Sequence, residues 1–283
     1  MAFFNYICNS KSQLTLNEIL QEAEGTLGQA FYNKLKKPTA EAIIRCFDAI
    51  TGMSNFKKNG TDIGKGEVAV ALFFKDCKLA SDEGDIDMSG EKYEIKGDSG
   101  SITARLPTGK FPQGMFNGLN TKDVANFTDI PIPPKELKKW IPTKMPKSID
   151  DVDEILKNIS GMDDTGKVIG WNNKDTTASG NDSMWKRVLK FRVLFSWAFC
   201  NYPQQYNLII GLNTSKNSRD LFTTPLLKIP GPSSYSGNWY DIGCKTLKLL
   251  ADKNISVGFH TISGKSEITF KIFFLVDKAK KNK

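Results

Sequence analysis

Hydrophobic residues recur at helical spacing in two stretches near the beginning of the chain. They return every three or four positions over residues 15–36 and again over residues 38–52. Thr15 and Glu18 form a capping-box pair at the start of the first stretch, and Gly52 is a natural stop for the second. The pattern predicts a helical N-terminal region, residues 1–55.

Strictly alternating polar and apolar positions follow. Residues 85–88 and 92–96 alternate on either side of the turn dipeptide Ser89-Gly90, which predicts a β-hairpin. Residues 101–106 alternate in the same way and predict a third strand. The strongly apolar stretch before the hairpin follows a Gly-rich loop at 56–66, and predicts a helix over residues 66–78.

Prolines and polar residues then interrupt the pattern from 107 to 181, which predicts a loop-rich insertion with one short helix near 150–159. Helical spacing returns over 183–200 and is followed by an apolar strand at 206–212. The C-terminal part predicts one helix, two strands and a basic tail from residue 277. The expected organisation is α+β, an α/β sandwich, in three segments: 1–55, a core at 56–229 that contains the insertion, and 230–283.

The composition of the chain limits the classes of binding partner to be expected. The chain of 283 residues has 39 Lys and Arg against 31 Asp and Glu, a net charge of +8. A basic protein is attracted to polyanions, of which nucleic acid is the commonest in a cell, although solubility alone also explains a modest excess. No apolar run reaches 18 residues, so we expect no membrane span. Five scattered cysteines and a start without a signal-like segment favour a reducing, cytoplasmic setting.

Several catalytic classes are disfavoured. His260 is the single histidine, and a structural role in a strand is the simplest reading of it. The cysteines and this histidine form no cluster with the spacing of a zinc site. Gly97-Asp98-Ser99-Gly100 has the letters of a serine-protease motif, but no histidine precedes Ser99 as that chain order requires.

The hairpin carries the candidate chemistry. If Ser89-Gly90 is a two-residue loop, Asp85 lies opposite Glu94, and both share one face with Lys96. Directly opposed like charges destabilise a sheet, whereas a divalent cation between two carboxylates removes the repulsion. The other face, with Ile86 and Tyr93, is expected to face a core.

These residues resemble the signature of the PD-(D/E)XK nucleases, the restriction-endonuclease-like superfamily. Asp85 matches its first acid, and Glu94-Ile95-Lys96 matches its Asp/Glu-x-Lys on the next strand. Glu67 matches the glutamate that many members carry on the preceding helix. Gly84 stands where the family usually has a proline.

The resemblance implies a restriction-endonuclease-like core, a mixed sheet flanked by helices, and an Mg²⁺-dependent endonuclease that hydrolyses DNA. Asp85, Glu94 and Glu67 would bind Mg²⁺, or Mn²⁺ in its place, and Lys96 would position the attacking water. It also suggests a bacterial or bacteriophage restriction setting and a possible homodimer. The basic residues expected to contact the nucleic acid are Lys65, Arg105, Lys186, Arg187 and Lys190.

Two alternatives remain open from the residues alone. One is a DNA-binding or virion structural protein that keeps the nuclease-like fold without catalysis. The other is a solvated hairpin whose lysines simply neutralise its acids.

Overall fold

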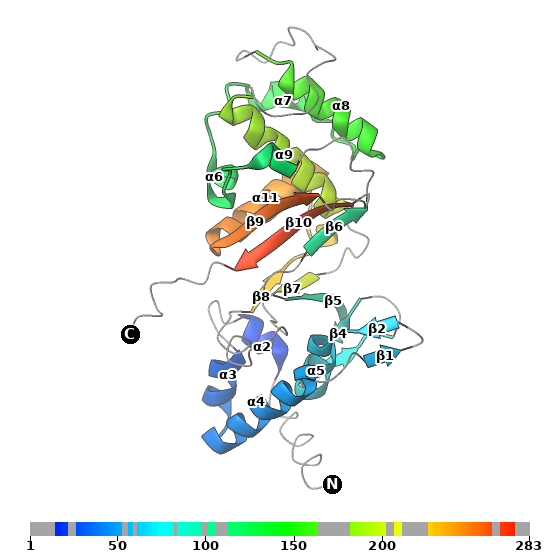
Figure 1. Cartoon of the computed structure of the whole chain (residues 1–283), viewed down its shortest axis with the longest axis vertical. Helices are drawn as coiled ribbons and strands as arrows, with labels where there is room; N and C mark the ends of the chain where they lie inside the picture. Colours follow the sequence, from blue (N-terminus) through cyan, green and yellow to red (C-terminus); the bar gives the residue numbers. More distant parts are fainter. Residues whose placement is uncertain are drawn as a thin grey trace, which may run out of the picture. The chain divides into compact units, whose positions relative to one another are not determined.

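The computed structural model shows a mixed α+β protein that divides into two compact units (Figure 1). The first unit comprises Met1–Gly100 and Tyr206–Gly231, and the second comprises Ser101–Gln205 and Pro232–Lys283. The expectation of an α+β class is confirmed. The structure describes residues 15–21, 27–52, 56–58, 61–81, 84–97, 101–105, 113–163, 182–201, 207–210, 226–261 and 267–274.

This division differs from the three segments expected from the sequence. The chain leaves the first unit after residue 100, not 107, and returns to it at residue 206. The C-terminal segment does not stand alone, because its strands and helix pack with residues 101–205. The basic tail lies outside the described residues.

The N-terminal helices of the first unit are α2 (Leu16–Gln21), α3 (Leu27–Lys34) and α4 (Lys37–Gly52). One of the two hydrogen bonds of the expected capping box is present, since the Glu18 amide donates to Thr15 Oγ1 at 3.3 Å. A second cap comes from Asp76, whose carboxylate accepts the amides of Leu16 and Asn17 at 2.8 and 3.0 Å. The pattern predicted one helix over 15–36, and its described residues fall in α2 and α3, while residues 22–26 lie outside the described part of the chain.

The helix that precedes the hairpin is shorter than predicted. It is α5 (Lys65–Phe73), and it ends because Phe74 adopts an extended conformation. Residues 77 and 78, expected to be helical, instead belong to β3 (Cys77–Leu79). The expected loop before α5 contains the short antiparallel strands β1 (Phe56–Lys58) and β2 (Thr61–Ile63).

A five-stranded sheet forms the centre of the first unit, in the order β3-β4-β5-β7-β8. The strands β4 (Ile86–Met88) and β5 (Glu91–Lys96) are the predicted hairpin. β7 (Asn207–Ile210) runs parallel to β5, and β8 (Leu227–Ile229) runs antiparallel to β7. The strand expected at 206–212 is confirmed over residues 207–210, and residues 206, 211 and 212 lie outside the described residues. β8 is an additional strand that the pattern did not indicate.

The hairpin has the predicted register. Ile86 pairs with Tyr93, and Met88 pairs with Glu91. Ser89 and Gly90 both have positive φ, 55° and 89°, which is the backbone of a two-residue turn matched to the strand twist. Ile86, Met88 and Tyr93 are buried in the core, together with residues of β3 and the N-terminal helices, so the apolar face lies where the alternation predicts.

The second unit is built on a three-stranded antiparallel sheet in the order β6-β10-β9. Its strands are β6 (Ser101–Arg105), β10 (Glu267–Phe274) and β9 (Ile255–Thr261). The expectation that 101–106 would be the third strand of the hairpin sheet is wrong, because β6 pairs with β10 over its whole length. Short alternating strands encode a face but not a partner, so their pairing is decided by the rest of the fold.

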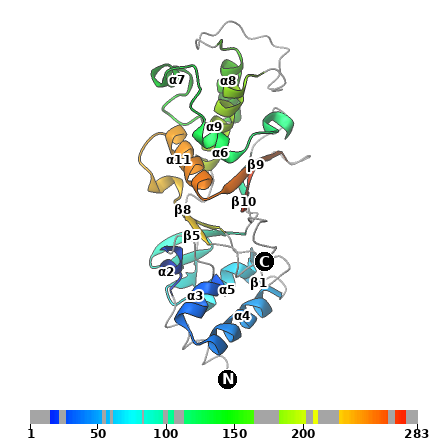
Figure 2. The same ribbon diagram turned by 90° about the vertical axis from the view of Figure 1, so that its left-hand side faces the viewer.

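α9 (Met184–Cys200) is the central helix of the second unit, and α8 (Ile149–Ser160) and α11 (Trp239–Asp252) pack against it (Figure 2). The predicted helices at 150–159 and 183–200 are confirmed. Edge-to-face aromatic contacts join α9 to the sheet, with ring centroids of Phe191 and Phe195 5.5 and 5.3 Å from that of Phe270. The core helix expected at 183–200 therefore belongs to the second unit.

The expected loop-rich insertion holds more helix than predicted. Besides α8, it contains η1 (Gln113–Phe116), α6 (Thr121–Asn126) and α7 (Pro134–Trp140), and the 3₁₀ turn η3 (Pro232–Ser234) follows later. Arg192, on α9, stabilises the C-terminal end of the short helix α6, because its guanidinium donates to the carbonyls of Val124 and Phe127. Such support from a distant side chain is not visible in local periodicity.

Replacing Gly243 by alanine should destabilise the second unit by about 3 kcal/mol, the upper range for overpacking a core. A Cβ at this position of α11 would overlap the backbone and side chain of Ser196 on α9, so the two helices must separate. Chemical denaturation measures the loss. Lys245→Ala, at an exposed position of the same helix, is the control and should change stability little. Equal stability of both variants would show that the helices can part without cost.

No helix within the described ranges has the length and apolar character needed to cross a membrane.

Candidate functional site

The four residues singled out by the sequence come from three neighbouring elements of the first unit. Glu67 lies in the first turn of α5, Asp85 directly precedes β4, and Glu94 and Lys96 lie on β5. The buried core fixes these elements through the opposite face of the hairpin. The acids are thereby placed on a rigid sheet and a helix end.

Glu67 is held at the start of α5. Gly64 is the N-cap residue, and its backbone amide donates to the Glu67 carboxylate. A Cβ at Gly64 would collide with Glu67 Oε1, so a glycine here lets the carboxylate fold back over the helix end. The helix N-terminus also favours a negative charge.

Asp85 is oriented by two backbone hydrogen bonds. Its amide donates to the Tyr93 carbonyl at 2.9 Å, and its Oδ2 accepts the Ile95 amide at 2.7 Å. The carboxylate thus takes the position of a backbone acceptor where the β4–β5 ladder ends. Gly84, just before it, has φ of 81°, which a proline cannot adopt. The backbone before β4 therefore has a conformation that explains why a glycine stands here and not the proline usual in the family.

Glu94 and Lys96 form an ion pair along β5. Lys96 Nζ donates to Glu94 Oε1, and the Glu94 side chain is only 6% exposed. Because this carboxylate is nearly buried, its charge interacts with its neighbours with little screening by water.

The raised pKa values of two acids show that the carboxylates are within electrostatic reach of one another. Burial raises the pKa of Glu67 to about 7, with repulsion from Asp85 and Glu94 adding to it. Burial also raises the pKa of Asp85 to about 6, with repulsion from Glu94 adding to it. Lys96 opposes both shifts. Three acids and one lysine therefore share one electrostatic environment.

This set suits a hard divalent cation in donor type and charge. Mg²⁺ prefers carboxylate oxygens, and a cation would relieve the repulsion that raises both pKa values. The side chains do not form a ready-made cage, since the described residues contain no group of three or more His, Cys, Asp or Glu at metal-ligand spacing. Binding would require carboxylates to turn toward the ion, and Glu94 to share its charge between Lys96 and the ion.

In chelator, the stability of the first unit should fall as pH rises from about 4 to 7. The folded protein binds protons at Glu67 and Asp85 more tightly than the unfolded chain does, so their protonated forms stabilise it most. Asp85→Asn should flatten this profile and raise the Tm at pH 8 above that of the wild type. Thermal denaturation at several pH values tests this.

The matched control is Asp87→Asn, two residues along on β4. Asp87 accepts the Gly90 amide at 3.0 Å and pairs with Lys78 at 3.4 Å, so it belongs to the turn and not to the acid cluster. Its replacement should leave the pH slope unchanged. Parallel pH profiles for wild type and Asp85→Asn would contradict the assignment of a shared acidic environment.

The predicted nucleic-acid contacts lie in different places. Lys65 is the first residue of α5, two positions before Glu67, and is half-buried. Arg105 ends β6 in the second unit, and its side chain lies outside the described part of the chain.

The three basic residues of α9 have structural contacts. Lys186 Nζ donates to the Ser160 carbonyl at 3.0 Å, and Arg187 donates to the Asn117 carbonyl. Lys190 is 1% exposed and pairs with Asp182 at 2.5 Å. Burial of Lys190 contradicts its expected role as a phosphate contact, because a buried ammonium cannot reach a phosphate group at the surface. Lys190 is buried because most of the surface of α9 is apolar and is covered by other elements.

Two positions that support the acids were not singled out from the sequence as supports. Gly64 allows Glu67 to reach its amide, and Gly84 allows the turn into Asp85. The signal available in the sequence was the placement of each glycine, three residues before Glu67 and one before Asp85.

No family model, no curated protein and no solved structure matches the chain.

Proposed function

We propose that the chain is a metal-dependent nuclease that hydrolyses phosphodiester bonds of DNA. One observation carries the proposal: Glu67, Asp85, Glu94 and Lys96, from α5, the entry to β4 and β5, act on one another electrostatically at one place. Three acids crowded beside one lysine destabilise a fold, and a divalent cation would relieve that cost and could in turn attract a phosphate group.

The sheet of the first unit supports a restriction-endonuclease-like core. β3, β4 and β5 are consecutive antiparallel strands, and β7 adds parallel to β5, with α5 preceding them all. Asp85 lies at the entry to the second of these strands, and Glu94 and Lys96 lie on the third. The expected mapping placed them on the first and second strands, with residues 101–106 as the third, and β3 now takes the first position. One departure is clear, since the segment between β5 and β7 belongs to the second unit, where the family places a core helix.

Each residue then has a distinct role. Asp85 and Glu94 would hold the metal ion, and Glu67, with its raised pKa, would assist directly or through water. The Lys96 ammonium orients the attacking water and offsets the charge that develops on the phosphate. The Ile95 amide fixes the Asp85 carboxylate and limits its rotation.

Bound Mg²⁺ would supply Lewis-acid stabilisation of the phosphoryl oxygens and a more acidic water. The chain itself keeps the acids on rigid elements and orients the water beside Lys96. No residue is required to form a covalent intermediate. The net charge of +8 supports a polyanionic substrate.

Incubation of the purified protein with supercoiled and linear DNA, in Mg²⁺ or chelator, tests the proposal. We expect cutting in Mg²⁺ and none in chelator. A protein that retains DNA in a gel shift but cuts none of it with Mg²⁺ or Mn²⁺ would be a binding protein on this fold. If the protein neither cuts nor binds DNA, the acids are only a charged surface of the hairpin.

A further inference from the structure

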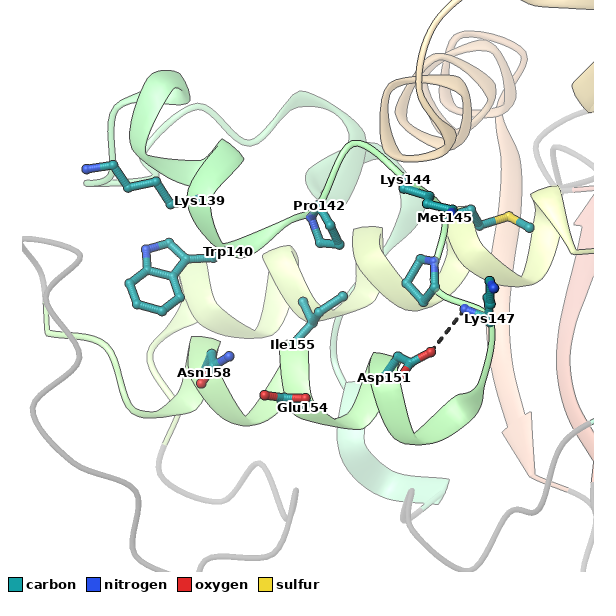
Figure 3. A pocket seen from close by; sticks show the side chains of 11 residues that line it. Lys139, Trp140, Pro142, Lys144, Met145, Lys147, Asp151, Glu154, Ile155 and Asn158 are labelled. Carbon is teal, nitrogen blue, oxygen red and sulfur yellow. Dashed lines mark hydrogen bonds between the residues drawn. The ribbon is translucent and has the colours of Figure 1, made fainter.

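A hollow in the second unit lies between the segment that joins α7 to α8 and one side of α8 (Figure 3). Its volume is about 410 Å³, toward the lower end of the range for small-molecule sites. This is space for a single nucleotide, and too little for a duplex. None of the residues proposed for catalysis lines it.

Two tryptophan side chains from neighbouring helices hold the wall of the hollow in place through hydrogen bonds. The indole N–H of Trp197, on α9, donates to the Pro146 carbonyl at 2.9 Å. The indole N–H of Trp239, on α11, donates to the Pro142 carbonyl at the same distance. Both prolines line the hollow and restrict the backbone, so the site exists before any ligand arrives.

One end of the hollow combines an aromatic ring with polar side chains. Trp140 lies near Asn158, and Glu154 lines the hollow one turn earlier on the same face of α8 (Figure 3). Buried Ile155 also lines the hollow and contributes an apolar surface. An indole ring stacks on any base, whereas a carboxylate and an amide bond to its polar edge.

The other end carries cations. Lys144 and Lys147 line it and are exposed. Hydrogen bonding from Ser148 lowers the pKa of the Asp151 carboxyl, and the charge of Lys147 is one of the smaller causes that add to this shift. The neighbouring Asp151 is occupied, because its Oδ2 accepts the amides of Lys147 and Ser148 at the start of α8. Lys139 also lines the hollow, but it pairs with Glu136 at 2.5 Å.

We propose that this hollow binds one unstacked nucleotide, with its base on Trp140 and its phosphate at Lys144 and Lys147. Glu154 accepts a hydrogen bond from an exocyclic amino group, which favours cytosine and adenine over thymine. The inference deepens the proposed function by adding a second contact with the nucleic acid, in which a base is out of the duplex stack.

Binding is measured by fluorescence anisotropy of labelled oligonucleotides, in chelator and in an Asp85→Asn background, so that cutting cannot consume the probe. Single-stranded oligo(dC), oligo(dA) and oligo(dT) are compared with a duplex. Competition with dCMP distinguishes a free nucleotide from a nucleotide within a strand as the natural ligand. Displacement of the labelled oligonucleotide by dCMP indicates a site for free nucleotides, and displacement only by unlabelled oligonucleotides indicates a site for a strand. Either result supports a nucleotide-binding hollow.

Trp140→Ala should weaken single-strand binding about tenfold, within the range for loss of one stacked base, and Trp140→Phe should keep most of it. Lys144→Ala with Lys147→Ala should weaken all single strands alike, whereas Glu154→Gln should reduce the preference for cytosine. Lys138→Ala is the matched control, because Lys138 is exposed on α7 and does not line the hollow. Circular dichroism and Tm confirm that each variant is folded.

Unchanged single-strand binding by folded Trp140→Ala would overturn the inference, as would binding to duplex alone. Failure of the nuclease proposal is a separate result, because it is read from the cutting of plasmid by the wild type. A protein that cuts DNA but binds single strands independently of Trp140 keeps the function and loses this site. A protein that binds through Trp140 but never cuts keeps the site and loses the function.

Discussion

Replacing Asp85 by asparagine should reduce Mg²⁺-dependent cutting of DNA about 10³-fold. The substitution keeps the hydrogen bond from the Ile95 amide but removes one charged ligand of the proposed ion. A loss of about 4 kcal/mol in transition-state stabilisation, within the range of metal-ion effects, corresponds to that factor. The rate of plasmid relaxation and linearisation measures it.

Lys96→Ala should lower the rate at least about 100-fold, as the loss of one oriented charge does in other sites. Its signature differs from that of Asp85→Asn. Loss of the lysine leaves the acids in place, so Mg²⁺ should still raise the Tm of Lys96→Ala, following mass action in metal concentration. That stabilisation should be absent from Asp85→Asn.

The control for both variants is again Asp87→Asn, which removes a carboxylate from the same hairpin without touching the acid cluster. Its cutting rate should stay within about threefold of the wild type, which corresponds to less than 1 kcal/mol. Equal activity of Asp85→Asn and Asp87→Asn would exclude Asp85 from the reaction.

Lys190→Ala should destabilise the second unit by about 3–5 kcal/mol, the typical cost of removing one partner of a buried ion pair. Its ammonium bonds to Asp182 and to Ser160 Oγ, and the Asp182 side chain is only 10% exposed. Alanine leaves this acid without its counter-ion and leaves a cavity in α9. Denaturation in guanidinium or urea measures the change.

Two further variants separate charge from volume. Ser160→Ala removes one hydrogen bond and should cost about 1 kcal/mol. Lys190→Met with Asp182→Asn removes both charges and keeps most of the volume, and should recover much of the stability lost in Lys190→Ala. If Lys190→Ala were as stable as the wild type, the ion pair would contribute nothing to the fold.

The hairpin could be predicted because its information is local. Alternation over β4 and β5 defines two faces, and the turn at Ser89-Gly90 fixes the register. Asp85, Glu94 and Lys96 follow on one face from that register alone, and Ile86 and Tyr93 on the other. Glu67 could be added because a glutamate in the first turn of a helix is itself a local signal.

The errors concern segments whose pairing partners are not evident from their own pattern. β6 alternates as well as β5 does, yet it pairs with β10, which is more than 160 positions later. The pattern predicts a helix end at residues 77 and 78, but pairing of β3 with β4, only seven to eleven positions further on, makes them part of a strand. In both cases strand pairing overrides the local propensity of the segment.

The amino-acid sequence by itself determines the α+β class, the longer helices, the hairpin with its register, and the acidic face that carries the candidate chemistry. These features depend on side-chain period and turn geometry within about twenty residues, which the chain states directly. Only the tertiary structure decides which strands share a sheet, that residues 101–205 and 232–283 form a second unit, and that Lys190 is buried. It also decides the raised pKa values of Glu67 and Asp85, because desolvation and repulsion depend on what packs around a charge.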